Sequence, residues 1–250
     1  MPAIEIKDKV VLITGANRGI GKAFALTALE MGAAKVYACA RDTSTLSEVQ
    51  EAGGDRVVPL QVDVTNQEQI TAAAAAAGDV EILVNNAGRG SAVGGPLVAT
   101  DSEEGMRAEL DANYFGIIKM VRAFAGILGG NGGGAVVNIL SVSALTSFPF
   151  APGYSASKHA AHSMTQHIRA ELIKQNTLVT GVYPGPIDTD MAKALPFDKA
   201  SPESVAVSVY EAIANGEEDV YPDPFAVEFV KQLEADRKAL EKANAAAIAG

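Results

Sequence analysis

Three residues whose side chains can hold or transfer protons lie close together in the second half of the sequence: Ser141, Tyr154 and Lys158. Tyr154 and Lys158 are four residues apart, which on a helix places them on one face, one turn apart. A free tyrosine has a pKa of about 10, and a nearby ammonium group favours the phenolate and lowers that pKa. We therefore predict that Tyr154 exchanges a proton with a bound molecule near neutral pH. A simple amphipathic pair on a surface helix is the alternative.

A second chemical feature is the segment VLITGANRGIG, residues 11–21, in which an apolar run leads into Gly15, Gly19 and Gly21. Glycine allows a sharp turn and a close approach of a ligand to the main chain. The N-terminus of the helix that follows offers free N–H groups and a partial positive charge. The segment predicts a loop that binds the phosphates of a dinucleotide. The alternative is a glycine-rich turn without a ligand.

The elements that must position these residues alternate along the chain. The predicted strands are nearly continuous in apolar character, which is typical of parallel strands buried on both faces. They cover residues 9–14, 35–40, 56–62, 80–85, 135–140, 177–183 and 219–223. The predicted helices cover residues 19–31, 66–77, 101–128, 152–175 and 202–215. This order predicts an α/β fold with a doubly wound parallel sheet of about seven strands and helices on both faces.

Composition narrows the function classes. The formal net charge of −10 argues against nucleic acid or an anionic membrane surface as a partner. The single cysteine, Cys39, cannot form an internal disulfide and fits a reducing compartment. The sequence shows neither a secretory segment nor an apolar run of about 20 residues. We expect a soluble cytoplasmic protein whose residues 1–250 form one dinucleotide-binding and catalytic domain.

Four motifs in the expected order carry a resemblance to a known family. Thr14 extends the glycine pattern to T-G-x-x-x-G-I-G, and NNAG occupies residues 85–88. Ser141 lies 13 residues before Tyr154 in YSASK, and YPGPIDT covers residues 183–189. The sequence resembles the short-chain dehydrogenase/reductase family over almost its whole length. The resemblance implies a Rossmann-like fold and an NADP(H)- or NAD(H)-dependent carbonyl reductase or alcohol dehydrogenase.

The resemblance also implies roles for four residues. Tyr154 would be the general acid for carbonyl reduction and the base for alcohol oxidation. Ser141 would hold the substrate oxygen, with Ser143 as the alternative. Lys158 would tune the tyrosine and bond the nicotinamide ribose. Asn113, in LDANYFG, matches the helix asparagine that positions a water behind the lysine, although a plain helix-face amide is the alternative.

The choice of nicotinamide cofactor depends on the end of the second strand. NAD-binding proteins usually place an acid there for the ribose 2′-hydroxyl, whereas this chain has Ala40 followed by Arg41. Arg18 lies in the glycine loop, and an arginine binds a phosphate through two parallel hydrogen bonds. Both arginines could instead be solvated loop residues, and Asp42 weakens the case for phosphate slightly. We favour NADP(H), with NAD(H) as the alternative.

The remaining site predictions concern larger groups of residues. Those expected to bind the cofactor are Gly15, Asn17, Arg18, Gly19, Ile20, Gly21, Arg41, Asp63, Val64, Asn86, Ala87, Gly88, Tyr154, Lys158, Pro184, Gly185, Ile187 and Thr189. The substrate pocket is expected from residues 89–96, 143–150 and a flexible segment 186–200. Leu145, Phe148 and Phe150 favour an apolar or aromatic aldehyde, ketone or alcohol over a charged sugar.

The remaining features of the sequence are interpreted as structural, with no part in binding or catalysis. His159, His162 and His167 share a predicted helix, but neither cysteine nor carboxylate completes a metal site on that face, so we predict no metal. The run GGNGGG, residues 129–134, precedes a strand and is read as a flexible connection. Residues 224–248 predict one amphipathic C-terminal helix.

The family implies a homodimer or homotetramer built partly from the helices at 101–128 and 152–175. A cofactor-binding sensor without turnover and an enzyme of elimination or epimerisation remain weaker alternatives.

Overall fold

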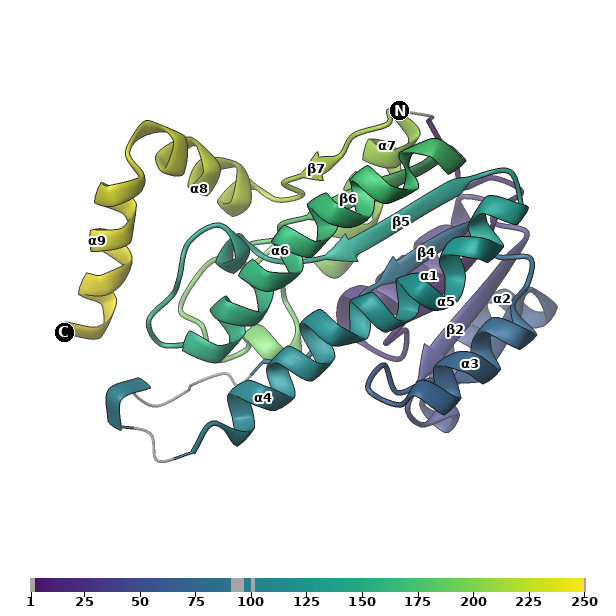
Figure 1. Cartoon of the computed structure of the whole chain (residues 1–250), viewed down its shortest axis with the longest axis horizontal. Coiled ribbons are helices and arrows are strands. Elements are labelled where there is room, and N and C mark those ends of the chain that lie inside the picture. Colours follow the sequence, from purple (N-terminus) through teal and green to yellow (C-terminus); the bar gives the residue numbers. More distant parts are fainter. Residues whose placement is uncertain (1–2, 91–96, 100–101, 250) are drawn as a thin grey trace.

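The parallel sheet is the centre of the molecule. The computed structural model describes residues 3–90, 97–99 and 102–249, and in this part of the chain seven strands form one sheet in the order β3-β2-β1-β4-β5-β6-β7 (Figure 1). The strands are β1 Val10–Thr14, β2 Lys35–Ala40, β3 Val57–Gln61, β4 Ile82–Asn85, β5 Gly134–Ile139, β6 Thr177–Val182 and β7 Asp219–Val220. Every neighbouring pair is parallel. The order reverses between β1 and β4, and ligands of open α/β sheets bind outside the carboxyl ends of the strands at such a point.

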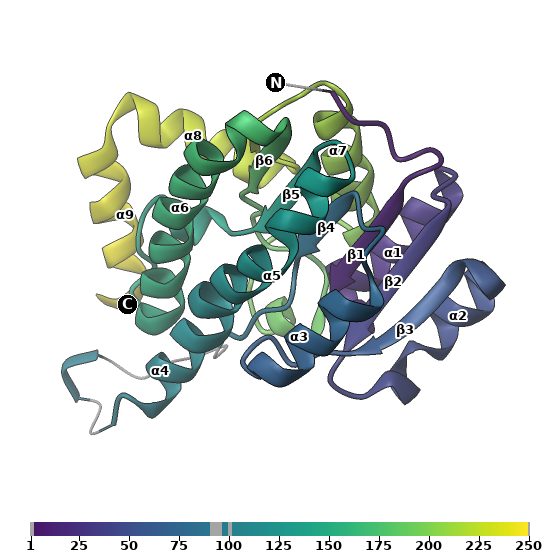
Figure 2. The same cartoon turned by 45° about the vertical axis from the view of Figure 1, so that its right-hand side comes forward.

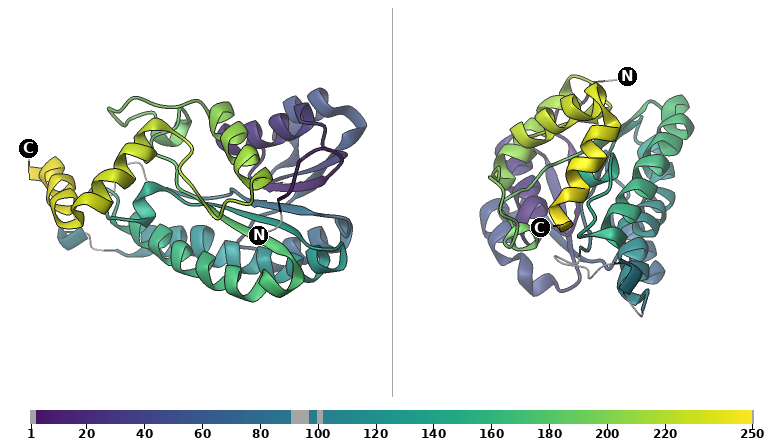
Figure 3. Two further views of the ribbon diagram at one scale, coloured as in Figure 1. Left: turned by 90° about the horizontal axis from the view of Figure 1, so that it is seen from above. Right: turned by 90° about the vertical axis from the view of Figure 1, so that its left-hand side faces the viewer.

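Helices cover both faces of the sheet. α1, α2 and α7 lie on one face and α3, α5 and α6 on the other, and Figures 2 and 3 show the sheet between these two layers. The helices of the described residues are α1 Gly19–Glu30, α2 Ser47–Gly53, α3 Gln67–Ala76, α4 Glu104–Leu110, α5 Gly116–Gly130, α6 Pro152–Leu172, α7 Pro202–Ala214, α8 Pro224–Ala235 and α9 Arg237–Ala249. The predicted α/β fold is confirmed.

The apolar strands are explained by the two helix layers. Along β1, Val11 and Ile13 pack in the core on the α1 and α7 side, whereas Leu12 packs in the core on the α3, α5 and α6 side. All three are fully buried. A strand covered on both faces has no position for solvated side chains, and this is why the sequence reads as continuous apolar runs rather than as alternation.

Two helix predictions need correction. The short helix α2 was not predicted, because its seven residues contain a single buried position, Val49, and give no visible apolar period. The helix predicted over 101–128 is divided into α4, a π-helical turn at Asp111–Phe115 and α5. The first residue of that prediction, 101, lies outside the described residues. π-helical turns inside α-helices occur often at functional sites, and this one carries Asn113.

The single C-terminal helix predicted over 224–248 is also wrong. It divides at Asp236, whose backbone is extended. The Asp236 carboxylate accepts hydrogen bonds from the backbone N–H groups of Lys238 and Ala239, both at 2.9 Å. This is the N-cap interaction that aspartate favours, so the chain starts a new helix there. Figure 1 shows α9 running in a different direction from α8.

The flexible connection predicted for the glycine run at 129–134 is shorter in the structure than predicted. Gly129 and Gly130 end α5, and Gly134 begins β5. Gly132 and Gly133 have φ of 94° and 107°, a region that side chains disfavour. Because the sheet is parallel, the start of β5 lies at the edge opposite to the Gly15 loop, so this run is far from a phosphate site. In the described part of the chain no helix is both long and apolar enough to cross a bilayer.

Candidate active site

The glycine loop lies between β1 and α1, as predicted. Gly15 and Gly19 have φ of 67° and 51°, which favours glycine. A Cβ atom on Gly21 would overlap the carbonyl oxygen of Gly15 and the side chain of Asn86. Arg18 is the N-cap of α1, and its side chain makes no capping hydrogen bond. The first N–H groups of α1 therefore have no side-chain cap, and this end of the helix fits the phosphates of a dinucleotide.

The loop after β4 is attached to the glycine loop by hydrogen bonds. The Thr14 hydroxyl accepts from the backbone N–H groups of Asn86 and Ala87, both at 3.0 Å. Asn86 Nδ2 donates to the carbonyl oxygens of Thr14 and Gly15 at 2.9 and 3.2 Å. These bonds join the loops after two adjacent strands. Because these bonds occupy the amide nitrogen of Asn86, its side chain connects the two loops.

Ser141 and Tyr154 meet at the carboxyl edge of the sheet. Ser141 lies two residues after the end of β5, and Tyr154 lies in the first turn of α6. The Ser141 hydroxyl lies close enough to Tyr154 to act on the pKa of the phenol as a hydrogen-bonding group. The Ser141 hydroxyl also accepts from the backbone N–H of Ser143 at 3.1 Å, as the N-cap of the short turn Val142–Ala144. Of the two serines, Ser141 is the one that acts on the pKa of Tyr154.

Lys158 completes the group from one turn further along α6. Its Nζ lies 5.6 Å from the centroid of the Tyr154 ring and donates to the carbonyl oxygen of Ile139 at 2.8 Å. A Cβ atom built on Gly88 would lie 3.8 Å from this Nζ, so the loop after β4 borders the lysine. The ammonium group thus lies between the tyrosine, the end of β5 and the NNAG loop.

The two titratable groups have pKa values displaced by burial. Burial raises the pKa of Tyr154 to about 12, assisted by the charge of Glu109 and opposed by the hydrogen bond to Ser141. Burial lowers the pKa of Lys158 to about 8. The lowered tyrosine pKa predicted from the sequence rests on the lysine together with a cationic nicotinamide ring. Burial within the chain opposes that lowering.

Asn113 lies in the π-helical turn and holds the chain after the NNAG loop. Its Oδ1 accepts from the backbone N–H of Arg89, and its Nδ2 donates to the carbonyl oxygen of Arg89, both at 2.7 Å. Nδ2 also donates to the Ser157 hydroxyl at 2.9 Å. The side chain is therefore fully engaged by protein, and it ties residue 89 to α6 beside Lys158.

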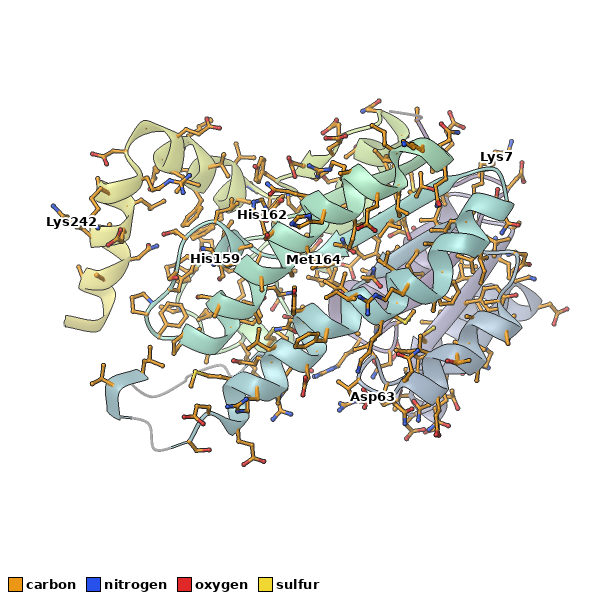
Figure 4. The ribbon with its side chains drawn as sticks, in the orientation of Figure 1. Lys7, Asp63, His159, His162, Met164 and Lys242 are labelled. Atoms are coloured by element: carbon orange, nitrogen blue, oxygen red, sulfur yellow. The ribbon has the colours of Figure 1, made fainter. Side chains whose placement is uncertain are left out.

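The arginines expected to bind the 2′-phosphate lie at the adenosine end of the site. Arg41 is exposed after β2, and Arg18 pairs with Asp190 at 2.8 Å. Burial acts to raise the pKa of Asp63, but hydrogen bonds from Thr65 and the charge of Arg41 outweigh it and hold that pKa below its usual range. Figure 4 shows Asp63 near α3.

Some predicted cofactor residues are available only through their backbone. The side chain of Val64 is buried against Gly116 of α5, and that of Ile187 is buried among α1 and α7. Asn17 and Ile20 are partly exposed in the glycine loop. Thr189 reaches that loop from the other side, since a Cβ atom on Gly19 would lie 3.1 Å from its Cγ2.

The loop after β6 is attached to α8 by a residue that the sequence analysis did not identify. The carboxylate of Asp223 accepts from the backbone N–H groups of Gly185 and Ala226 at 2.8 and 2.9 Å. Asp223 is 4% exposed. It is the N-cap of α8, and the sequence DPFA already carries this signal: an N-cap aspartate followed by proline. The carbonyl of Pro184 accepts from Val142 N–H at 3.0 Å, which joins this loop to the serine.

The predicted substrate residues belong to a larger group of phenylalanines. Phe148 contacts Phe150 and Phe229 with ring centroids 5.6 and 5.7 Å apart. Phe225 contacts Phe229 and Phe197 at 6.1 and 5.6 Å. We call these five residues the phenylalanine wall. Leu145 packs beside it, and the backbone N–H of Phe148 donates to the Ser155 hydroxyl at 3.1 Å, next to Tyr154.

Three of the wall residues and two further neighbours of Tyr154 were missed. Phe225 and Phe229 lie on α8, which the sequence alone assigned to packing, and Phe197 lies in the segment 186–200. A Cβ atom on Gly90 would lie 3.2 Å from both the Met191 sulfur and the Tyr154 ring, so Gly90 lies next to both side chains. Glu109 is buried beside Gly153. Of the pocket segment predicted over 89–96, residues 91–96 lie outside the described residues.

Two of the three histidines of α6 contact polar atoms of the protein. His159 Nδ1 lies 2.9 Å from the Ser155 carbonyl oxygen, and His162 Nδ1 lies 2.8 Å from the Tyr183 hydroxyl. Figure 4 shows both rings along α6. Within residues 3–90, 97–99 and 102–249, no group of three or more His, Cys, Asp and Glu side chains is placed to hold a metal ion.

Comparison with known proteins places this chain in a family. Residues 9–200 match the sequence profile described as short chain dehydrogenase. The chain belongs to the short-chain dehydrogenase family. A relative from Staphylococcus saprophyticus, described as an uncharacterized oxidoreductase, is 34% identical over 197 residues, which cover 76% of this chain and 82% of the relative. A dehydrogenase/reductase family protein of Anopheles gambiae is 31% identical, covering 90% of this chain and 78% of the relative.

Solved structures of the short-chain dehydrogenase family carry the same fold. A short chain dehydrogenase from Burkholderia cenocepacia, in complex with NADP, matches with a TM-score of 0.90 at 41% identity, covering 96% of this chain and 99% of that one. A family member from Burkholderia phymatum, in complex with NAD, matches with a TM-score of 0.83 at 28% identity, covering 94% and 96%. The chain is therefore an oxidoreductase of this family in sequence and fold.

Proposed function

We propose that this short-chain dehydrogenase is an NADP(H)-dependent oxidoreductase that interconverts an aldehyde or ketone and the corresponding alcohol. The observation that carries the proposal is the placement of the Ser141 hydroxyl and the Lys158 ammonium beside Tyr154. A hydroxyl pair next to a buried cation, at the carboxyl edge of a sheet with a phosphate-binding loop, suits proton transfer to a substrate oxygen.

Each residue has one task in this proposal. When bound, the nicotinamide supplies or accepts the hydride. Ser141 donates a hydrogen bond that holds the substrate oxygen, and Tyr154 gives that oxygen a proton in reduction or removes it in oxidation. The Lys158 ammonium stabilises the phenolate that Tyr154 forms. Asn113 is a positioning residue, because it fixes Arg89 and Ser157 around the lysine.

We prefer NADP(H) over NAD(H) as the cofactor because of the charges of the residues that follow β1 and β2. Ala40 ends β2, where an acid would select the ribose 2′-hydroxyl of NAD, and Arg41 follows it. Arg18 adds a second cation from the glycine loop. A 2′-phosphate carries about two negative charges, and these two guanidinium groups are suited to it. The NADP bound to the Burkholderia cenocepacia relative supports this choice, and the NAD bound to the Burkholderia phymatum relative is why both cofactors are tested.

The substrate proposed is an apolar or aromatic carbonyl compound. The phenylalanine wall runs from the 145–150 loop to α8 and the segment 186–200, and Met191 and Tyr154 both lie next to Gly90. Aromatic side chains bind apolar groups by burial and by edge or offset ring contacts. A charged sugar would leave its charges and hydroxyl groups without partners on such a surface.

The test is turnover of reduced nicotinamide, followed by its absorbance, with a panel of aromatic ketones, short aldehydes and charged sugars. We expect reduction of the aromatic ketones with NADPH. Tyr154→Phe removes the transferable proton alone, and turnover should fall by about 100-fold or more while NADPH binding, measured by calorimetry, is retained. NADPH binding without turnover on any compound would instead favour a sensor, and near-normal turnover in Tyr154→Phe would contradict the role of the tyrosine.

We further propose that the protein is cytoplasmic and forms a homodimer or homotetramer through α4, α5 and α6. Phe115, between α4 and α5, is 46% exposed and contacts Tyr114, and such an apolar patch suits a helix interface between copies. Light scattering with Phe115→Arg tests it, since a charge at a buried interface should dissociate the oligomer. An unchanged mass would contradict this interface.

A further inference from the structure

The glycine loop and the segment 186–200 are joined by an ion pair. Arg18 Nη1 and Asp190 Oδ2 are 2.8 Å apart, and the two residues are 172 positions apart in the chain. Their side chains are 66% and 75% exposed. Beside the pair, Thr189 lies against Gly19. The guanidinium that the sequence analysis assigned to a 2′-phosphate therefore already has an anionic partner in the protein.

We propose that Asp190 is a specificity-determining residue for the cofactor, because its carboxylate competes with the 2′-phosphate of NADP(H) for the Arg18 guanidinium. This inference rests on the proposed NADP(H) dependence. A phosphate with about two negative charges attracts a guanidinium more strongly than one carboxylate does, so Arg18 leaves Asp190 when NADP(H) binds. NAD(H) has no phosphate at that position, and the pair stays intact.

The competition lowers the preference for NADP(H) without abolishing it. An exposed ion pair is weak, and breaking one costs at most a few-fold in affinity. That cost falls on NADP(H) alone. Asp190 thereby brings the affinities of the two cofactors closer together, and the contribution of Arg41 to phosphate binding does not depend on this pair.

Asp190→Asn tests the proposal, because it removes the charge and keeps the shape of the side chain. The measurement is the Kd of NADPH and of NADH for the ligand-free full chain by calorimetry at low salt. The NADPH Kd should fall by about 2- to 5-fold, and the NADH Kd should change little. Asp188→Asn is the matched control, since Asp188 is an exposed carboxylate of the same segment and removes the same charge.

Arg18→Ala, alone and combined with Asp190→Asn, completes a double-mutant cycle. In that background Asp190→Asn should no longer alter the ratio of the two Kd values, because the carboxylate has no guanidinium to withhold. If Asp190→Asn and Asp188→Asn lowered the NADPH Kd equally, the cause would be general charge repulsion, and the proposal would be overturned. Weaker NADPH binding by Asp190→Asn would also overturn it, because Asp190 would then be orienting Arg18 for the phosphate. A wild-type chain that binds neither cofactor would instead refute the proposed function itself.

Discussion

Replacing Lys158 by methionine should stabilise the ligand-free protein while removing its activity. Lys158 is 5% exposed, and burial lowers its pKa from 10.5 to about 8. At pH 7 the folded protein therefore holds an ammonium group that its surroundings disfavour. A pKa difference of about 2.5 corresponds to roughly 3 kcal/mol. Methionine has a similar length and no charge, so this cost disappears.

The substitution also removes a hydrogen bond to the carbonyl oxygen of Ile139, and this offsets part of the gain in stability. The lysine Nζ donates to this oxygen at 2.8 Å, and leaving a buried acceptor without its donor costs about 1–2 kcal/mol. The free energy of unfolding of Lys158→Met should then exceed that of the wild type by about 1–2 kcal/mol. For a chain of this length about 1 kcal/mol corresponds to about 2–4 °C in Tm, so Tm should rise by about 2–8 °C.

The assay is thermal and urea unfolding followed by circular dichroism at one protein concentration. Lys174→Met, at an exposed lysine just after α6, is the control and should change Tm little. The pH dependence has a defined sign. Because the folded-state pKa of Lys158 is depressed, wild-type stability gains from its deprotonation as pH rises from about 8 to 10.5, and the advantage of methionine should shrink over that range.

A Lys158→Met protein that is less stable than the wild type at pH 7 would refute this reasoning, as would an advantage that does not depend on pH. The raised pKa of Tyr154 lowers stability above pH 10 in both proteins, so it largely cancels in the comparison. A stabilised but inactive variant would show that the site retains the buried cation for chemistry at the expense of stability.

Three further outcomes follow from the site. Ser141→Ala should lower kcat by about 100-fold or more, whereas Ser143→Ala should lower it less than about tenfold, since the geometry brings Ser141 to Tyr154; the reverse order in a kcat comparison would contradict this. Arg41→Ala should raise the KM for NADPH by about tenfold and leave that for NADH unchanged, and an unchanged ratio of kcat/KM would refute phosphate binding by Arg41. Phe229→Ala should raise the KM for aromatic ketones more than for short aldehydes, whereas equal changes for both would exclude the phenylalanine wall from substrate binding.

Local patterns predicted most of the fold and the arrangement of the site. Continuous apolar runs indicated strands covered on both faces, and the glycine spacing located the turn between β1 and α1. The strands and this turn depend on residues near one another in sequence, whose backbone conformation and helical face are set by local sterics. The choice of Ser141 over Ser143 came from the family resemblance, through the distance of 13 residues to Tyr154.

Features that depend on distant contacts could be seen only in the structure. The pairing of Arg18 with Asp190 and the assembly of Phe148, Phe225 and Phe229 join segments that have no pattern in common. The sign of the Tyr154 pKa change is of the same kind. Spacing alone placed a cation near the phenol and predicted a lowered pKa. The tertiary structure adds the opposing effect of burial, which raises this pKa, because desolvation depends on everything packed around a group.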